Sequence, residues 1–367
     1  MHRTPVAQTL PDFPWDSLAD AKSLAQSHPD GIVDLSVGTP VDPVAPVIQS
    51  ALSSVASVPG YPTTHGTIEF REAAAKSMER RYGIAGIDPA AVLPAIGTKE
   101  MIAWLPRLLA VQAGDTVVIP ELAYPTYEVG ALLAGASVLR ADSTVAIGPQ
   151  RVSMIFLNSP SNPTGRVLGV DHLRKVVDWA RERGIIVVSD ECYLGLGWDT
   201  QPVSVLDPAV CGGNLDGLLA VHSLSKTSNL ASYRAGFVVG DPELVGDLLA
   251  VRKHAGMMVP LPIQAAATAA MANDEHEAEQ KERYRRRRTI LLEAVRSAGF
   301  TVDYSEAGLY LWATRDEPCR DTVQWLAERG ILAAPGEFYG PTGNKHVRIA
   351  LTASDERINT AAHRISA

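Results

Sequence analysis

One short stretch in the second half of the chain gathers residue types that can do covalent chemistry. Ser223, Ser225 and Lys226 follow the apolar run Leu218–Val221, and Arg234 lies eight positions after the lysine. The run is typical of a buried strand, so the amine and the hydroxyls come together at a strand end. An amine can condense with an aldehyde, while hydroxyls and a guanidinium can donate to a phosphate. Taken alone, the stretch fits a surface turn with a solvated lysine better than a reactive site. A reactive site therefore requires partner residues elsewhere in the chain.

Polar residues also stand at the ends of other predicted strands. Asn162 follows the apolar run Val152–Leu157, and Asp190 follows Ile185–Val188. Because ligands of parallel sheets bind at the carboxyl ends of the strands, we expect these residues to lie near Lys226. By themselves Asp190 fits a strand-end turn and Asn162 a plain β-turn. Together they favour pyridoxal phosphate, the common cofactor that carries both an aldehyde and a phosphate.

From about residue 91 the chain alternates between strand and helix patterns. Strand, crossover helix and parallel strand predict a mostly parallel sheet with helices on both faces. Gly97, Asn162, Asp190 and Lys226 should then lie along one rim. The predicted strands are Ala91–Ile96, Thr116–Ile119, Val152–Leu157, Ile185–Val188 and Leu218–Val221, with helices from Lys99, from Tyr124 and around Leu173–Ala180.

After Gly299 short strands and two helices predict a smaller α+β unit. The chain has 367 residues, more than one hydrophobic core accommodates, so we expect two packed units that share one site. We place an N-terminal arm and part of the small domain at 1–45, a large cofactor-binding domain at 46–285 and a C-terminal small domain at 286–367. One helix is expected from Pro262 to about Ser297.

Composition argues against several classes of partner. A net charge of −8 disfavours a nucleic-acid surface. The basic stretch Lys281–Arg288 has acidic residues one helical turn upstream, which predicts a solvated helix face. Three cysteines are too few for a disulfide framework or a zinc cluster. Residues 1–16 lack the apolar core of a signal peptide, and 256–272 are short for a bilayer span. We expect a cytoplasmic protein without nucleic-acid or membrane partners.

Three motifs together carry a resemblance to a known family. They are Asn162–Gly165, Asp190 with Tyr193, and Ser223–Lys226 with Arg234. Over nearly its whole length the chain resembles fold type I pyridoxal-phosphate enzymes of the class I and II aminotransferases. The resemblance implies an α/β fold: a large domain with a mostly parallel mixed sheet flanked by helices, and a smaller α+β domain.

The cofactor ring needs particular partners. A carboxylate beside the pyridine nitrogen keeps that nitrogen protonated, which makes the ring an electron sink, and Asp190 is the candidate. Asn162 and Tyr193 can donate to the phenolic oxygen. The resemblance implies that Tyr124 stacks on the ring, although an aromatic core anchor is nearly as good an explanation.

The phosphate should be held by direct hydrogen bonds. Candidate donors are Ser223, Ser225 and Arg234, together with the backbone of the Gly97–Thr98 turn at a helix start. A charge-assisted bond is worth about 1.5 to 3 kcal/mol and a helix dipole only about 0.3 to 1, so Arg234 should matter most. By resemblance, Tyr61 reaches the phosphate of the neighbouring subunit, which implies a homodimer with shared active sites.

The substrates implied are an amino acid and a 2-oxo acid. Lys226 resembles the lysine that holds the cofactor and shuttles the proton of the substrate's α-carbon. Arg348 matches the receptor of the α-carboxylate, a task that suits a bidentate guanidinium; an arginine on an exposed strand is the alternative. Gly38 resembles the glycine that lets backbone approach the substrate. Lys99 could bind a further carboxylate or be a solvated first-turn lysine.

The resemblance narrows to bacterial succinyldiaminopimelate aminotransferases. It rests on the stretches Leu35–Val44, Asp190–Trp198, His254–Pro260 and Glu306–Thr314. It implies transfer between N-succinyl-LL-2,6-diaminopimelate and 2-oxoglutarate in lysine biosynthesis. The alternatives are an aspartate or other amino-acid aminotransferase, a β-lyase, or a cofactor-sensing regulator. A regulator is disfavoured because fewer than 40 residues precede Gly38.

Overall fold

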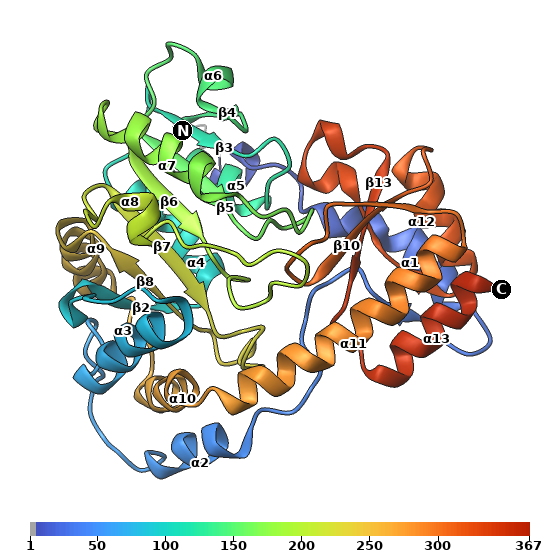
Figure 1. Cartoon of the computed structure of the whole chain (residues 1–367), viewed down its shortest axis with the longest axis horizontal. Helices are drawn as coiled ribbons and strands as arrows, with labels where there is room; N and C mark the ends of the chain where they lie inside the picture. The colour runs from blue at the N-terminus through green and yellow to red at the C-terminus, as the bar shows by residue number, and fades with distance from the viewer. Residues whose placement is uncertain (1–4) are drawn as a thin grey trace.

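The computed structural model describes residues 5–367, which form a larger and a smaller unit (Figure 1). The larger unit is built on a seven-stranded sheet with the order β2-β8-β7-β6-β5-β3-β4. Strand β8 is antiparallel to both of its neighbours, and the other pairs are parallel. The strands are β2 (Val92–Ile96), β3 (Thr116–Ile119), β4 (Ser137–Arg140), β5 (Met154–Asn158), β6 (Ile186–Asp190), β7 (Leu218–Ser223) and β8 (Ala235–Gly240).

Helices cover both faces of this sheet because neighbouring strand residues point to opposite sides. In β5, Ile155 and Leu157 pack in one hydrophobic cluster and Phe156 in another. The first cluster includes side chains of α2 (Pro46–Ser54), α3 (Ile68–Tyr82), α7 (Val170–Arg181), α8 (Pro208–Cys211) and α10 (Leu261–Ala272). The second includes side chains of α4 (Thr98–Leu108), α5 (Thr126–Ala134) and α9 (Pro242–Ala255). The predicted doubly covered, mostly parallel sheet is confirmed.

The smaller unit has a four-stranded antiparallel sheet with the order β12-β13-β10-β9. The N-terminal part of the chain packs here, since β1 (Val33–Asp34) pairs in parallel with β11 (Ile331–Leu332). A buried cluster that includes Leu35, Leu291 and Ile349 forms its core. The remaining elements are α1 (Ala19–Gln26), β9 (Thr301–Asp303), β10 (Tyr310–Thr314), α12 (Cys319–Glu328), β12 (Ala334–Pro335), β13 (His346–Ala350) and α13 (Asp355–Ser366).

The single helix expected at Pro262–Ser297 is wrong, because the structure has two helices there. Helix α10 ends at Ala272, Asn273 is extended, and α11 (Glu275–Ser297) begins after Asp274. The carboxylate of Asp274 accepts hydrogen bonds from two arginines of α3, Arg80 and Arg81, so the break is tied to the larger unit. In Figure 1, α11 spans from α10 toward α13, and we propose that the domain boundary lies within it.

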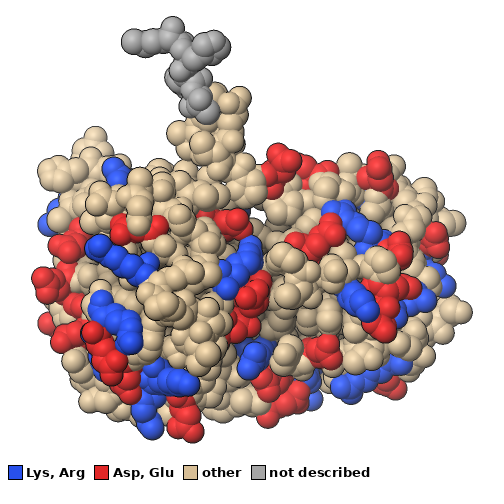
Figure 2. Space-filling view, turned by 90° about the horizontal axis from the view of Figure 1, so that it is seen from above, with Lys and Arg blue, Asp and Glu red and all other residues tan. Residues whose placement is uncertain are grey.

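The basic stretch in α11 is not simply a solvated face. Arg287 is buried and binds the carboxylates of Asp42 and Asp355, while Arg288 pairs with Asp199. These ion pairs tie α11 to three other segments. Elsewhere acidic and basic side chains are interspersed, as Figure 2 shows for one face. Over residues 5–367 no helix combines the length and the apolarity needed to cross a bilayer.

Short local signals fix the element ends near the site. The Thr67 hydroxyl accepts the Phe70 N–H at the start of α3, and the left-handed Gly83 ends that helix. Gly97 follows β2 and starts α4, Asp190 ends β6, and Lys226 comes shortly after β7. The predicted rim is therefore confirmed as an arrangement of strand ends.

Candidate active site

Lys226 lies at the rim with its amine turned toward the N-terminal segment. Its Nζ donates a hydrogen bond to the carbonyl of Gly38, and its own carbonyl accepts one from the Tyr284 hydroxyl at 3.1 Å. Burial lowers the pKa of Lys226, because an ammonium loses solvation there. A lowered pKa raises the fraction of neutral amine, the form that attacks an aldehyde.

Asp190 is a buried carboxylate with few donors. It is 5% exposed, its Oδ2 accepts from the Tyr127 hydroxyl at 2.7 Å, and its Oδ1 accepts from the Cys192 backbone N–H at 3.1 Å. Burial raises the pKa of Asp190, and the bonds from Cys192 and Tyr127 oppose that shift. A cation beside this carboxylate would be stabilised in turn.

Arg348 links the smaller unit to the turn at the end of β5. Its Nη1 donates to Asn162 Oδ1 at 2.8 Å, and its Nη2 donates to the Ser36 carbonyl at 2.7 Å. The side chain is buried, its Nε has no partner, and among residues 5–367 no carboxylate lies within 4 Å of it. A guanidinium has five donors. A buried cation with donors to spare is suited to an incoming carboxylate.

Aromatic rings surround this guanidinium. The carbon centre of Arg348 lies 4.0 Å from the ring of Tyr310, 5.0 Å from Tyr339 and 5.9 Å from Trp15. Such contacts stabilise a desolvated cation. The Tyr339 hydroxyl and the Trp15 Nε1 are buried without a partner within the described part of the chain. Two further hydrogen-bonding groups are therefore available beside the cation.

The Gly97–Thr98 turn lies against the side chain of Arg234. Gly97 has a φ of +71°, and a Cβ at this position would lie 2.1 Å from Arg234 Nη2. Only glycine allows this approach of the guanidinium to the first residues of α4. Arg234 is exposed, and its Nη1 donates to the Ala231 carbonyl at 2.9 Å. The guanidinium and the helix start form a cradle suited to a phosphate.

Other predicted donors lie beside this cradle. Ser223 and Ser225 are buried, and Ser223 Oγ accepts the Ser225 N–H at 3.1 Å. Thr98 Oγ1 accepts a hydrogen bond from Cys192 Sγ at 3.4 Å, which joins the turn to the segment after Asp190.

Tyr124 and Tyr193 have different surroundings. The Tyr193 hydroxyl lies 3.1 Å from the Tyr310 hydroxyl, and burial raises the pKa of Tyr193. Tyr124 is half-buried, with its ring edge-on to Tyr127 at 5.8 Å between centroids. Gly38 is needed for space, since a Cβ there would lie 2.3 Å from the Tyr310 hydroxyl.

Two predicted site residues lie apart from the residues around Lys226, Asp190 and Arg348. Tyr61 is 94% exposed and lies at the surface of the single chain. Lys99 is exposed, with its Nζ 5.5 Å from the ring centre of Phe13. The Phe13 ring lies 5.6 Å from Trp15, so the Lys99 amine is at the outer end of a row that leads to Arg348.

Sequence reasoning missed the positioning residues. Tyr127 lies in the helix predicted from Tyr124, which gives it no role of its own, and Ser36 contributes through its carbonyl, which no side-chain pattern reveals. Trp15, Tyr310 and Tyr339 resemble ordinary core aromatics in a sequence. Only the proximity of Tyr127 to Tyr124 was a signal that could have found one of them.

The residues present fit pyridoxal phosphate. A half-buried amine of lowered pKa suits the aldehyde, a buried carboxylate suits the ring nitrogen, and the cradle of Gly97 and Arg234 suits the phosphate. Asn162 and Tyr193 supply polar groups between these points and Arg348.

Comparisons with known proteins show the family of the chain. The model of the family "Aminotransferase class I and II" matches residues 30–365. The chain is 68% identical to "Probable aminotransferase Rv1178" of Mycobacterium tuberculosis, over 98% of this chain and 86% of the relative. It is 57% identical to the 4-dedimethylamino-4-oxo-anhydrotetracycline transaminase OxyQ of Streptomyces rimosus, over 97% and 99%. A solved structure described as a probable N-succinyldiaminopimelate aminotransferase from Thermus thermophilus superposes with a TM-score of 0.87 at 28% identity, over 96% and 99%.

Proposed function

Because the chain belongs to the class I and II aminotransferases, which depend on pyridoxal phosphate, we propose that it moves an amino group between an amino acid and a 2-oxo acid through Lys226. The observation that carries the proposal is the buried guanidinium of Arg348, which has no carboxylate within 4 Å among residues 5–367. An amino acid and a 2-oxo acid each have an α-carboxylate, which a bidentate guanidinium binds well.

Each side chain has one task in the proposed reaction. When bound, the cofactor supplies a protonated ring that takes up the electrons of the substrate's α-carbon. Asp190 holds the positive charge at the ring nitrogen, and Asn162 and Tyr193 donate to the phenolic oxygen. Lys226 Nζ accepts and returns the proton of the α-carbon. Arg348 fixes the carboxylate so that this proton lies near the amine.

We propose N-succinyl-LL-2,6-diaminopimelate and 2-oxoglutarate as the substrate pair. A long substrate with several carboxylates needs donors beyond Arg348, and Tyr339 Oη and Trp15 Nε1 have no hydrogen-bond partner among residues 5–367. Lys99, at the outer end of the row through Phe13 and Trp15, suits a distal carboxylate. The likeness to the Thermus thermophilus protein supports this choice.

A second candidate substrate is a ketone on a large ring system. The name of the relative OxyQ gives a 4-oxo-anhydrotetracycline as its substrate, and the chain is 57% identical to it. The aromatic residues Trp15, Tyr310 and Tyr339 could pack against a flat ring. A substrate without an α-carboxylate would leave Arg348 without its anion, so the two candidates differ in their dependence on this arginine.

We also propose a homodimer in which Tyr61 reaches the partner's phosphate site. Its exposure, with Val58 and Ile68 also exposed nearby in sequence, fits a surface that a second copy covers. Light scattering gives the mass in solution. A monomer that is fully active at all concentrations would contradict the shared site.

The test of the activity begins with the covalent link. Borohydride should fix the cofactor to the peptide that contains Lys226 in the wild type, and Lys226→Ala should show neither the adduct nor turnover. Lys76→Ala, which removes a surface lysine with a 68% exposed side chain, is the matched control. An adduct at another lysine would refute the assignment.

The substrate is identified with a panel of amino donors and oxo acids. It includes glutamate, aspartate, succinylated diaminopimelate and ring ketones, each scored by amino-group transfer. The highest kcat/KM should fall on the succinylated substrate. A ring ketone that is aminated equally well by an Arg348→Met variant would favour the second candidate.

A further inference from the structure

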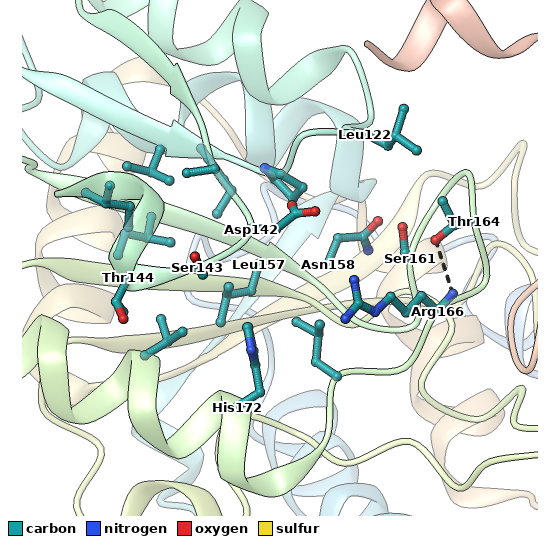
Figure 3. A pocket seen from close by; sticks show the side chains of 18 of the residues that line it. Leu122, Asp142, Ser143, Thr144, Leu157, Asn158, Ser161, Thr164, Arg166 and His172 are labelled. Carbon is teal, nitrogen blue, oxygen red and sulfur yellow. Dashed lines mark hydrogen bonds between the residues drawn. The ribbon is translucent and has the colours of Figure 1, made fainter. Parts of the chain in front are cut away.

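A pocket of about 110 Å³, shown in Figure 3, lies outside the candidate active site. It is on the opposite face of the large sheet from Tyr127. Ile155 and Leu157 of β5 line it and belong to the cluster with α7, whereas Phe156 packs with Tyr127 on the opposite face. Val118 of β3 and Val176 of α7 complete an apolar floor. For comparison, an apolar cavity of about 150 Å³ holds a benzene molecule. The pocket therefore has room for a small aliphatic group.

The mouth of the pocket carries one negative and one positive side chain. Asp142 follows β4, and Arg166 follows the turn that carries Asn162. Within residues 5–367 neither forms an ion pair within 4 Å, although both line the same pocket. Asp142 Oδ1 accepts the Glu121 N–H at 2.9 Å, and Arg166 lies 5.4 Å from the ring of Tyr304. Figure 3 shows both side chains turned toward the pocket from different segments.

His172, from the first turn of α7, adds a polar group without a charge. Burial lowers the pKa of His172, and the neighbouring Arg166 lowers it further, while Asp142 opposes the shift. Lys175 also lowers it from one turn away on the same helix. The imidazole is therefore neutral near pH 7, and the charges that face a ligand are those of Asp142 and Arg166.

Separated opposite charges above an apolar floor complement a zwitterion with an apolar side chain. A carboxylate would pair with Arg166, an ammonium with Asp142, and an aliphatic chain would occupy the floor. A simple carboxylate would leave Asp142 beside an anion, and a simple amine would leave Arg166 beside a cation. The arrangement thus favours an aliphatic α-amino acid over an aliphatic carboxylate or an aliphatic amine.

Asn158 connects this pocket to the proposed catalytic rim. It lines the pocket, its Nδ2 donates to the Asp190 carbonyl at 3.0 Å, and its Oδ1 accepts the Asn162 N–H at 2.7 Å. Ser161 and Thr164, from the same turn as Asn162, also line the pocket. A ligand here would contact the segment that positions the partner of Arg348.

We propose that the pocket binds a free aliphatic L-amino acid as an effector, and that its occupancy changes the affinity of the catalytic site. The proposal that an amino acid binds depends on the pocket alone, whereas its effect on catalysis rests on the proposed aminotransferase function. Because such coupling is reciprocal, a substrate in the catalytic site must alter the affinity for the effector by the same factor.

The binding test uses borohydride-reduced holoenzyme, in which the catalytic amine can no longer exchange with amino acids. L-Leucine is titrated by calorimetry, beside 4-methylpentanoate and 3-methylbutylamine, which each lack one charge. L-Leucine should bind at least about 10-fold more tightly than either analogue, corresponding to one lost charge-assisted contact. Equal binding of an analogue would overturn the zwitterion assignment.

Variants locate the bound amino acid. Arg166→Gln and Asp142→Asn should each weaken L-leucine binding about 10-fold or more, and Leu157→Trp should abolish it by filling the floor. Lys175→Gln, which removes an exposed charge on the same helix outside the lining, is the matched control and should bind normally. Unchanged binding in both charge variants, or its loss in reduced Arg348→Lys, would place the ligand elsewhere and overturn the proposal.

The coupling test uses unreduced enzyme. L-Leucine should change the apparent KM for glutamate by about 5-fold or more in the wild type and leave Asp142→Asn unaffected. If L-leucine changes the KM of the wild type and of Asp142→Asn equally, it competes at the catalytic site. That result would refute regulation through the pocket. If borohydride traps no cofactor, the proposed function fails, while L-leucine binding still decides whether the pocket is a site.

Discussion

Tyr127→Phe is the sharpest test of the buried carboxylate. The Tyr127 hydroxyl donates to Asp190 Oδ2 at 2.7 Å, and both side chains are buried. A hydrogen bond to a charged group is worth about 1.5 to 3 kcal/mol, or about 10- to 100-fold in an equilibrium or a rate. Phenylalanine keeps the ring and removes only the donor. The variant should therefore fold normally with kcat reduced about 10-fold or more.

The pH dependence separates this role from a packing effect. The bond from Tyr127 opposes the upward shift that burial gives the pKa of Asp190, so losing it raises that pKa further. A protonated Asp190 cannot hold a cation, so the acidic limb of the kcat profile should move to higher pH in Tyr127→Phe. The assay is the initial rate of amino transfer over pH, with cofactor saturating.

Tyr233→Phe is the matched control, because the half-buried Tyr233 packs against the other hydrophobic cluster of the sheet, not the cluster that contains Tyr127. Its profile should overlay that of the wild type. The reasoning is refuted if Tyr127→Phe, properly folded and fully loaded, has a wild-type kcat and an unshifted acidic limb. In that case the bond to Asp190 does not set the charge at the ring nitrogen.

Three other variants test separate parts of the structure. Gly97→Ala should weaken cofactor binding about 10-fold, because its Cβ would displace the guanidinium of Arg234 and the φ of +71° is strained for alanine; an unchanged Kd in a spectroscopic titration would argue against the cradle. Arg348→Lys should raise the KM for glutamate about 10- to 100-fold, since lysine offers no planar fork; normal half-reaction kinetics would place the carboxylate elsewhere. Burial raises the pKa of Glu191 to about 7, so its carboxyl stabilises the fold below its ordinary pKa and that contribution is lost as pH rises to about 7. Glu191→Gln should remove roughly 3 kcal/mol of pH dependence between those values, measured by urea unfolding, and an unaltered slope would show that Glu191 does not titrate in this range.

The periodic parts of the sequence were the predictable parts. Buried parallel strands read as apolar runs, so β3 was predicted with its observed limits, Thr116–Ile119. Strand β4 was not predicted, since Ser137–Arg140 is half-exposed at the sheet edge and lacks such a run. The break between α10 and α11 was missed because Asn273 and Asp274 are not strong helix breakers. Their effect depends on tertiary partners, chiefly Arg80 and Arg81.

The same distinction holds for the site. Residues with covalent or charged chemistry, such as Lys226 and Asp190, attract notice at strand ends. Tyr127 and the Ser36 carbonyl do not, because their contribution is a direction and a distance that only the fold supplies. Polar atoms without partners, such as Tyr339 Oη, become visible only once every neighbour is placed.

Arg348 explains why the site needs both units of the fold. It lies on β13 of the smaller unit, yet its guanidinium donates to Asn162 of the larger unit and to Ser36 of the N-terminal segment. A buried cation without a carboxylate partner destabilises whatever holds it. An incoming α-carboxylate would remove that penalty at the point where the three segments meet. Substrate binding should therefore tighten the contact between the two units, and an amine analogue without a carboxylate should not.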